Sequence, residues 1–423
     1  MSGAQAPSST TRVLQILGPG LITGASDDDP SGIATYSQVG AQFGFDMGWV
    51  MLFSFPLMCA IQETAARIGR ATGEGIAGNI RRHYSPLLLR VMVAPLLIAN
   101  TINLGADLGA MGNVVNMLVG GPALLYAVLF GALCAGLQIF TAYKRYVGIL
   151  KWITVTLFAY VAAALVVRIP WGEVAWRTLV PSMRIETSYV VAIVAVLGTT
   201  ISPYLFFWQS SQEAEEVRQD PHAKPLKRAP RQAPDEFRRI RIDTYLGMFL
   251  SNVIGWFIII TVAATLNAHG IKDISSAGQA AEALRPAAGA FAFLLFALGI
   301  IGTGLLSVPV LAGSAAYALA EALKWPAGLA RRAKAARAFY GTIAAATFVG
   351  AMFNFFPVDP IKALFWSAVI NGLVAVPIMI MTMVMARQKR VMGNFVLPWP
   401  LASLGWIATA VMTLVAMAMF VTW

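Results

Sequence analysis

Long apolar segments recur along the whole chain, and they constrain its fold more than any other feature. Each spans about 20 residues or more, the length that a membrane-crossing helix needs. Only 12% of the 423 residues are charged, about half the share in a soluble globular domain, so a soluble fold is excluded. We therefore predict an all-α polytopic membrane protein with eleven transmembrane helices. The eleven segments are residues 13–43, 47–66, 87–119, 123–141, 147–167, 189–211, 242–266, 287–323, 338–357, 363–386 and 401–421.

The basic residues gather in alternate loops between these segments. If the N-terminus lies in the cytoplasm, 25 of the 31 Lys and Arg residues fall in inward-facing segments. Because positive loops stay on the cytoplasmic side, we expect a cell inner-membrane protein with a cytoplasmic N-terminus and with Trp423 outside. Contact of these loops with anionic membrane lipid explains the net charge of +11, so we expect no nucleic-acid partner. We also expect a monomer.

The sequence carries no signature of an enzyme. It has no GxSxG, HExxH or P-loop motif, so we expect no catalytic residue and no cofactor. Both cysteines, Cys59 and Cys134, lie within apolar segments, where they are expected to pack as small apolar side chains. The longest polar connector, residues 212–241, contains four prolines among its charges and is predicted to be a flexible cytoplasmic loop.

Three consecutive carboxylates, Asp27, Asp28 and Asp29, interrupt the first apolar segment and are followed by Pro30. Proline lacks the N–H that a continuing helix requires, so the helix must break there. One interpretation is a turn outside the membrane, in which Asp29 caps a new helix that starts at Pro30. Only about 12 mostly apolar residues flank the break on each side, too few for a span, so we favour a broken membrane helix.

A second segment, residues 189–211, is interrupted in the same way by Gly198, Thr199, Thr200, Ser202 and Pro203. Five spans begin from each break, and interrupted helices at equivalent places in two halves are typical of inverted-repeat secondary transporters. We therefore predict a single transmembrane domain over residues 1–423. Its predicted parts are repeat one at 13–167, repeat two at 189–386, the loop at 212–241 and an extra helix at 401–421.

The chemistry at the two breaks favours a cation. Broken helices expose backbone carbonyls and helix ends at mid-membrane, and here carboxylates accompany them. Neither break contains Lys, Arg or His. Carboxylate, hydroxyl and carbonyl oxygens are the ligands that suit Mg²⁺, Mn²⁺ or Ca²⁺.

At these two motifs the chain resembles the Nramp family of divalent metal transporters. The resemblance is densest over residues 18–120, which include GPG, the Asp-Pro break and the run GIATYSQVGAQFGF. It implies a LeuT-like fold of two inverted five-helix repeats in which helices 1 and 6 are broken. It also implies transport of a divalent metal ion, which is then the substrate and not a cofactor.

The resemblance further implies a set of metal ligands. The metal-binding Asp of helix 1 corresponds to Asp29, and helix 6 would contribute the carbonyl of Thr199 and the hydroxyl or carbonyl of Ser202. The Gln of helix 10 that approaches the metal aligns with Ala368, so Asn371, one turn further on, would make a water-mediated contact instead.

The chain also departs from the family pattern. Family members carry Asp-Pro-Gly-Asn in helix 1, whereas Gly32 here replaces the Asn. In helix 6, Ser202 replaces a soft thioether ligand and Tyr204 replaces a histidine. These changes leave a roomier, all-oxygen site, which suits Mg²⁺ because this ion retains water. The pattern is similar to the Nramp-related magnesium transporters, so we predict transport of Mg²⁺ or Mn²⁺.

The sequence allows two roles for each of three further acids. Asp27 and Asp28 would either bind the cation or line its entrance. Asp107 would be either an additional acid near the site or a partner in a structural hydrogen bond.

The helix 3 acid pair of proton-coupled members aligns with Ala106 and Gly109, with only Asp107 beside them, so we expect no proton relay from that pair. A divalent cation gains about 4.6 kcal/mol on entering at 100 mV, inside negative. We therefore expect uncoupled uptake by alternating access. Two other functions stay open: a LeuT-fold transporter of a small organic substrate such as an amino acid, and a non-transporting membrane sensor.

Overall fold

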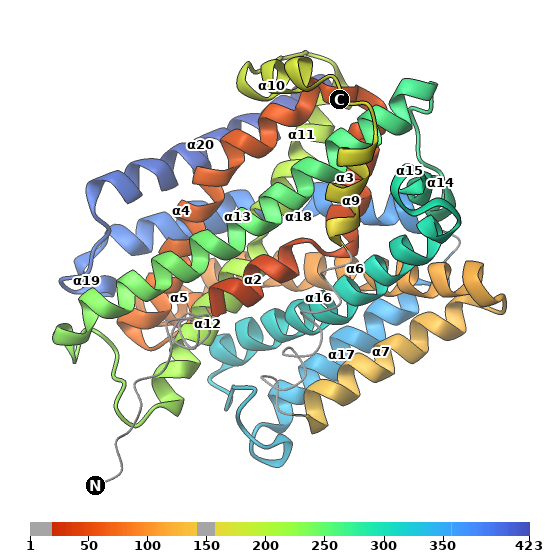
Figure 1. Ribbon diagram of the computed structural model, residues 1–423. Helices are drawn as coiled ribbons and strands as arrows, with labels where there is room; N and C mark the ends of the chain where they lie inside the picture. Colours follow the sequence, from red (N-terminus) through yellow and green to blue (C-terminus); the bar gives the residue numbers. More distant parts are fainter. Residues whose placement is uncertain (1–18, 142–156, 357) are drawn as a thin grey trace, which may run out of the picture.

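The computed structural model describes residues 19–141, 157–356 and 358–423. In these residues the chain forms α-helices, short 3₁₀ turns and loops, with no β-strand (Figure 1). Within them, eight helical stretches are long and apolar enough to cross a membrane. The all-α polytopic fold class is therefore confirmed. The α-helices are α2 (Pro19–Asp27), α3 (Pro30–Phe43), α4 (Gly48–Thr72), α5 (Ile76–His83), α6 (Pro86–Val119), α7 (Ala123–Phe140), α9 (Phe158–Val166), α10 (Trp171–Leu179), α11 (Thr187–Thr200), α12 (Pro203–Gln219), α13 (Ala233–Thr265), α14 (Ala277–Glu282), α15 (Arg285–Ala288), α16 (Ala292–Leu323), α17 (Arg337–Phe353), α18 (Pro360–Arg387), α19 (Lys389–Met392) and α20 (Trp399–Thr422).

Every one of the eleven predicted apolar segments contains a helix in the described residues. The starts of the first and fifth segments, residues 13–18 and 147–156, lie outside them. α9 has 9 residues and α17 has 17, both short of a full crossing. The count of eleven membrane helices therefore stays a prediction.

Both predicted helix breaks are present. Asp28 and Asp29 separate α2 from α3, and Ile201 and Ser202 separate α11 from α12. α3 and α12 both begin with a proline. A proline suits a first turn because its fixed φ is helical and its missing N–H needs no partner there.

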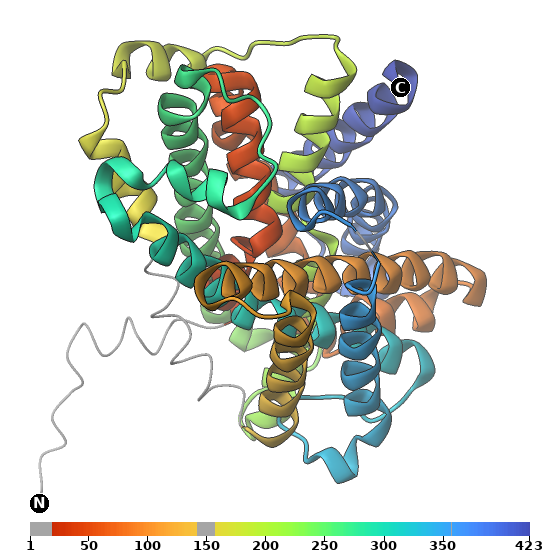
Figure 2. The same ribbon diagram turned by 90° about the vertical axis from the view of Figure 1, so that its right-hand side faces the viewer.

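Contacts between the long helices come in equivalent pairs that the two halves of the fold relate to each other. α3 packs on α13 and α12 packs on α4, while α6 packs on α7 and α16 packs on α17. When each of the first five spans is matched to the span five places later, the first contact becomes the second and the third becomes the fourth. Inverted repeats require this equivalence. Figure 2 shows α6 crossing the middle of the bundle, with α7 and α17 side by side next to it. The LeuT-like arrangement is thus confirmed, and the repeat boundaries stay predictions.

The connections between helices gather at two ends of the bundle (Figure 1). At one end the Leu226 N–H, between α12 and α13, donates to the Arg70 carbonyl at 3.3 Å. At the other end the Ser182 hydroxyl, between α10 and α11, donates to the Asp46 carbonyl at 2.8 Å. Loops that alternate in the sequence thus meet at the same end, as the predicted topology requires. Which end faces the cytoplasm stays a prediction.

The connector predicted over residues 212–241 is shorter than expected, because α12 and α13 extend into it from both sides. Its charges stabilise these helix ends by pairing with one another. The Arg239 guanidinium lies 2.5 Å from the buried Glu213 carboxylate. The charge-rich composition therefore reflects ion-paired helix ends as well as a loop.

Glycines bring the backbones of α2 and α13 into direct contact. A Cβ atom at Gly24 would lie 2.6 Å from the Gly247 Cα, and one at Gly20 would lie 2.7 Å from the Thr244 nitrogen. The Gly20 N–H also donates to the Asp243 carboxylate at 2.6 Å, which satisfies one of the free N–H groups in the first turn of α2. α2 is therefore held tightly along α13.

Candidate cation-binding site

The Asp29 carboxylate lies at the break between α2 and α3 and is only 1% exposed. Its Oδ1 accepts hydrogen bonds from the Ser31 hydroxyl and the Gly32 backbone N–H, both at 2.7 Å. Its Oδ2 accepts one from the Asn103 amide at 3.0 Å and lies 3.5 Å from the Tyr204 hydroxyl. Asp29 thus caps α3 with one oxygen and directs the other toward α6 and α12.

Gly32 leaves an oxygen-lined space beside this carboxylate. A Cβ at Gly32 would lie 3.0 Å from the Thr199 hydroxyl oxygen, 3.3 Å from the Asp27 carbonyl oxygen and 3.5 Å from Asp29 Oδ1. A side chain at residue 32 would fill this space. Without one, a carboxylate, a carbonyl and a hydroxyl face the same point, and these are the ligand types that hard divalent cations prefer.

The second break presents its oxygens differently from the prediction. The Ser202 hydroxyl lies 2.7 Å from the Gly198 carbonyl and 2.8 Å from the Thr199 carbonyl, and its single proton donates to one of them at a time. Both carbonyls belong to the last turn of α11, where helical partners are missing. Ser202 therefore covers the helix end that was expected to face the cation. The Thr199 oxygen that borders the space at Gly32 is its hydroxyl.

Tyr204 connects the two breaks. Its hydroxyl donates to the Ser26 carbonyl, in the last turn of α2, at 3.0 Å. The side chain is 1% exposed, so this contact lies in the interior. Since the single hydroxyl proton is directed to Ser26, the oxygen lone pairs of Tyr204 are free to face a cation or its water.

Asp27 and Asp28 share one partner on α13. The Ser251 hydroxyl lies 2.6 Å from Asp27 Oδ2 and 3.1 Å from Asp28 Oδ1, although its single proton can serve only one of them at a time. Asp27 is fully buried and Asp28 is 3% exposed. Among the described residues, Asp27 Oδ1 has no hydrogen-bond partner.

Asp107 and Asn371 reach the same interior from α6 and α18. Asp107 accepts a hydrogen bond from the Ser307 hydroxyl of α16 at 2.9 Å, so the structural hydrogen bond considered for it is present. Its Oδ1 and the Asn371 Oδ1 accept none from the part of the chain that the structure describes. A buried acceptor without a donor costs about 1–3 kcal/mol, so both oxygens are available to a cation or water.

Four carboxyl groups are thus buried near the breaks, those of Asp27, Asp28, Asp29 and Asp107. Within residues 19–141, 157–356 and 358–423, none of them forms a salt bridge. Burial of unpaired charge is costly, so protons, bound cations or, as at Asp29, several hydrogen-bond donors must stabilise them. No group of three or more His, Cys, Asp or Glu is arranged to hold a metal in the described residues. A cation here would therefore have mixed carboxylate, carbonyl, amide and hydroxyl ligands.

Sequence reasoning missed the residues that hold these acids in place, namely Asn103, Ser251 and Ser367. The Ser367 hydroxyl of α18 donates to Asn103 Oδ1 at 2.7 Å, which extends the network from Asp29 to α18. One signal was present in the sequence. Asn103 lies four residues before Asp107 in an apolar span, so both are expected on one face of α6.

The chain matches the sequence profile of a family described as Nramp, natural resistance-associated macrophage protein-like, over residues 20–422. The divalent metal cation transporter MntH of Klebsiella pneumoniae (strain 342) is 28% identical over 303 residues, which cover 70% of this chain and 70% of that protein. The protein of the same name from Deinococcus radiodurans is 24% identical over 318 residues, which cover 73% of this chain and 70% of that protein.

Solved structures show the same fold. A manganese transporter of Eremococcus coleocola, in complex with an aromatic bis-isothiourea substituted compound, superposes with a TM-score of 0.74 at 19% identity, over 98% of this chain and 88% of that one. Mhp1, a nucleobase-cation-symport-1 family transporter in a closed conformation, superposes with a TM-score of 0.50 at 16% identity, over 96% and 92%.

Proposed function

The chain belongs to the Nramp family, and from this premise we propose that it transports divalent metal cations across a membrane by alternating access. The observation that carries the proposal is the burial of four carboxyl groups beside two helix breaks, without a salt bridge to any of them in the described residues. A divalent cation neutralises two of these charges at once. Relatives named as divalent metal cation transporters support the same substrate class.

We place the principal ligand at Asp29. Its Oδ2 faces the Asn103 amide in the interior, and oxygens of Thr199 and Asp27 border the space at Gly32 beside its Oδ1. The Thr199 hydroxyl borders that space, while Ser202 and Asn371 would contact the ion through their side-chain oxygens or through water. Asp27 and Asp28 add negative charge that attracts the cation to the break.

The ligand set favours hard cations. The described side chains that hydrogen-bond Asp29, those of Ser31, Asn103 and Tyr204, offer no thioether, and Ser202 stands where the related family pattern has a soft ligand. We therefore propose Mn²⁺ and Mg²⁺ as substrates. The solved relative named as a manganese transporter supports Mn²⁺, and the oxygen ligands around Gly32 support a hard cation such as Mg²⁺.

We propose uptake without proton coupling, into a cytoplasm that faces the end of the bundle containing Leu226. A membrane potential of 100 mV alone supplies about 4.6 kcal/mol to a divalent cation, on the order of a thousand-fold gradient. The test is Mn²⁺ uptake into proteoliposomes that contain a manganese-sensitive dye in one preparation and a pH-sensitive dye in another. Mn²⁺-driven acidification of the lumen would contradict uncoupled transport.

The role of Asp29 is tested in the same assay by Asp29→Asn, which preserves shape and removes one charge. We expect uptake to be lost in this variant and retained in Asp273→Asn, a matched change at an exposed aspartate outside the helices. Excess Mg²⁺ should compete with Mn²⁺ in the wild type. Absence of uptake for every divalent cation would refute the function, whereas uptake by Asp29→Asn at the wild-type rate would refute only the site.

A further inference from the structure

The Asn103 side chain of α6 joins Asp29 to α18 by two hydrogen bonds. Its Nδ2 donates to Asp29 Oδ2 at 3.0 Å, and its Oδ1 accepts from the Ser367 hydroxyl at 2.7 Å. Asn103 is fully buried and Ser367 is 1% exposed. The amide thus covers the carboxylate oxygen that a cation would need.

The Ser367 hydroxyl has more acceptors than it can serve. It lies 2.7 Å from Asn103 Oδ1 and also 2.7 Å from the Leu364 carbonyl, and both of these atoms are acceptors. A hydroxyl has a single proton, so one of the two contacts is always left without it. Rotation of the Asn103 amide by half a turn removes this conflict. Its NH₂ group would then donate to the Ser367 oxygen while the Ser367 proton stays on Leu364.

The two ends of Asn103 therefore favour opposite amide orientations. Asp29 without a cation is better satisfied by the NH₂ group, because a carboxylate is an acceptor only. Ser367 is better satisfied when the amide oxygen faces Asp29. When a cation binds at Asp29, the carboxylate no longer needs the NH₂ donor of Asn103, and the cation attracts the amide oxygen. The contacts with Asp29 and with Ser367 then both favour the rotated amide.

We propose that Asn103 is a reversible ligand of the transported cation, covering Asp29 through its NH₂ group in the empty site and binding the cation through its amide oxygen in the loaded one. Ser367 is the positioning residue that stabilises the rotated form. This inference rests on the proposed function, because it names a further residue of the same site. The rotation changes the ligand set without changing the volume of the side chain.

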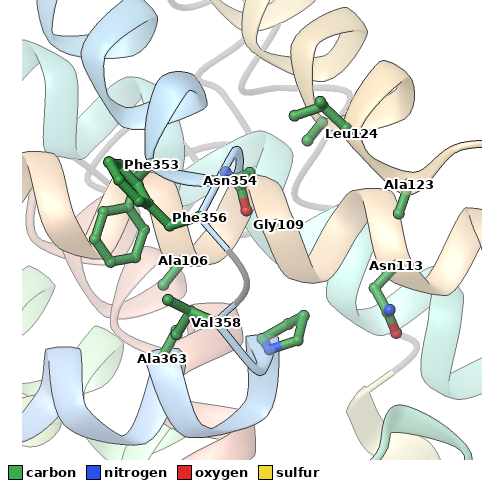
Figure 3. A pocket seen from close by; sticks show the side chains of 12 residues that line it. Ala106, Gly109, Asn113, Ala123, Leu124, Phe353, Asn354, Phe356, Val358 and Ala363 are labelled. Carbon is green, nitrogen blue, oxygen red and sulfur yellow. The ribbon is translucent and has the colours of Figure 1, made fainter.

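A cavity of about 260 Å³ lies one turn away from this pair, between α6, α7, α17 and α18 (Figure 3). Ala106 and Ala363 line it, three residues after Asn103 and four residues before Ser367. Since residues three or four apart share a helix face, the Asn103–Ser367 pair lies beneath the cavity. Neither Asn103 nor Ser367 lines the cavity itself, so one helical turn separates the pair from it.

Equilibrium Mn²⁺ binding to the purified full-length protein, measured by the electron paramagnetic resonance signal of free Mn²⁺, tests the proposal. Ser367→Ala should weaken binding about tenfold, equivalent to about 1.4 kcal/mol, because the rotated NH₂ group loses its acceptor. Asn103→Leu should weaken it at least as much. Asn103→Asp should tighten it, because a second carboxylate replaces the amide oxygen. Thr382→Val is the matched control, since it removes a buried hydroxyl from the same helix without touching the site.

The outcomes separate this inference from the proposed function. If wild-type protein binds no divalent cation, the proposed function is refuted, and this inference with it. If wild-type binding is lost in Asp29→Asn but unchanged or tighter in Ser367→Ala and Asn103→Leu, the amide is only a structural clamp and this inference alone is overturned. Weaker binding by a folded Asn103→Asp protein would overturn it as well, because a clamp role predicts loss there and a ligand role predicts gain.

Discussion

Replacing Gly24 with alanine should shift the protein toward a state in which α2 has left α13. The added Cβ would lie 2.6 Å from the Gly247 Cα, whereas two carbon atoms pack best at about 3.5–4.0 Å, so α2 must move outward by about 1 Å. Overpacking of this kind destabilises the state in which α2 is packed on α13 by about 1–3 kcal/mol, and it does not affect the state in which α2 has moved away. The equilibrium between the two states should therefore move about 5- to 150-fold.

A cysteine at Thr244 reports this movement. Thr244 is fully buried and its backbone contacts α2, so a water-soluble thiol reagent should reach Thr244→Cys only when α2 moves away. In a Cys59→Ala, Cys134→Ala background, labelling should be faster with Gly24→Ala. The matched control is Gly136→Ala on α7, where a Cβ meets no atom within 4 Å. Equal labelling rates in the two glycine variants would refute the idea that α2 opens by leaving α13.

Three further changes test other parts of the structure. Arg239→Gln leaves the buried Glu213 without its guanidinium partner at 2.5 Å, so the free energy of unfolding should fall by about 3 kcal/mol, seen as a lower unfolding midpoint in detergent. Ala106→Leu fills part of the cavity between α6, α7, α17 and α18; if cations enter through it, Mn²⁺ uptake should slow while equilibrium Mn²⁺ affinity stays unchanged. Asp46→Asn removes the carboxylate that Arg177 contacts at 3.0 Å, so trypsin should cleave the segment around α10 faster. An unchanged midpoint, uptake rate or digestion rate would contradict the respective prediction.

The fold was largely predictable because its strongest signals are local. A membrane helix needs about 20 apolar residues in a row, and a break needs a proline beside polar groups, so both can be found within one short stretch of sequence. The loop at 212–241 was harder to delimit. Its composition is that of a loop, but the pairing of Glu213 with Arg239 allows charged residues to continue two helices.

The site was predictable only where its residues lie at the breaks themselves. Asp29 could be recognised from its own neighbours in the sequence, whereas its partner Asn103 lies 74 residues away. Ser202 shows a second limit of sequence reasoning. It occupies the expected position, yet its hydroxyl donates to α11 carbonyls, because a free helix end nearby offers acceptors at 2.7 and 2.8 Å. Side-chain direction of this kind depends on tertiary packing and is not encoded in a motif.

The three adjacent aspartates also bear on how the chain enters a membrane during synthesis. At the centre of a helix that inserts alone, each aspartate costs about 2.5–3.5 kcal/mol, so the triplet opposes insertion of the first span by about 8–10 kcal/mol. Ser251, which hydrogen-bonds Asp27 and Asp28, is made more than 220 residues later. We therefore expect that the first span is not stably inserted in the membrane directly after its synthesis. We expect the insertion machinery to retain it until α13 has been translated, so that more than half of the protein exists before its first helix is secure.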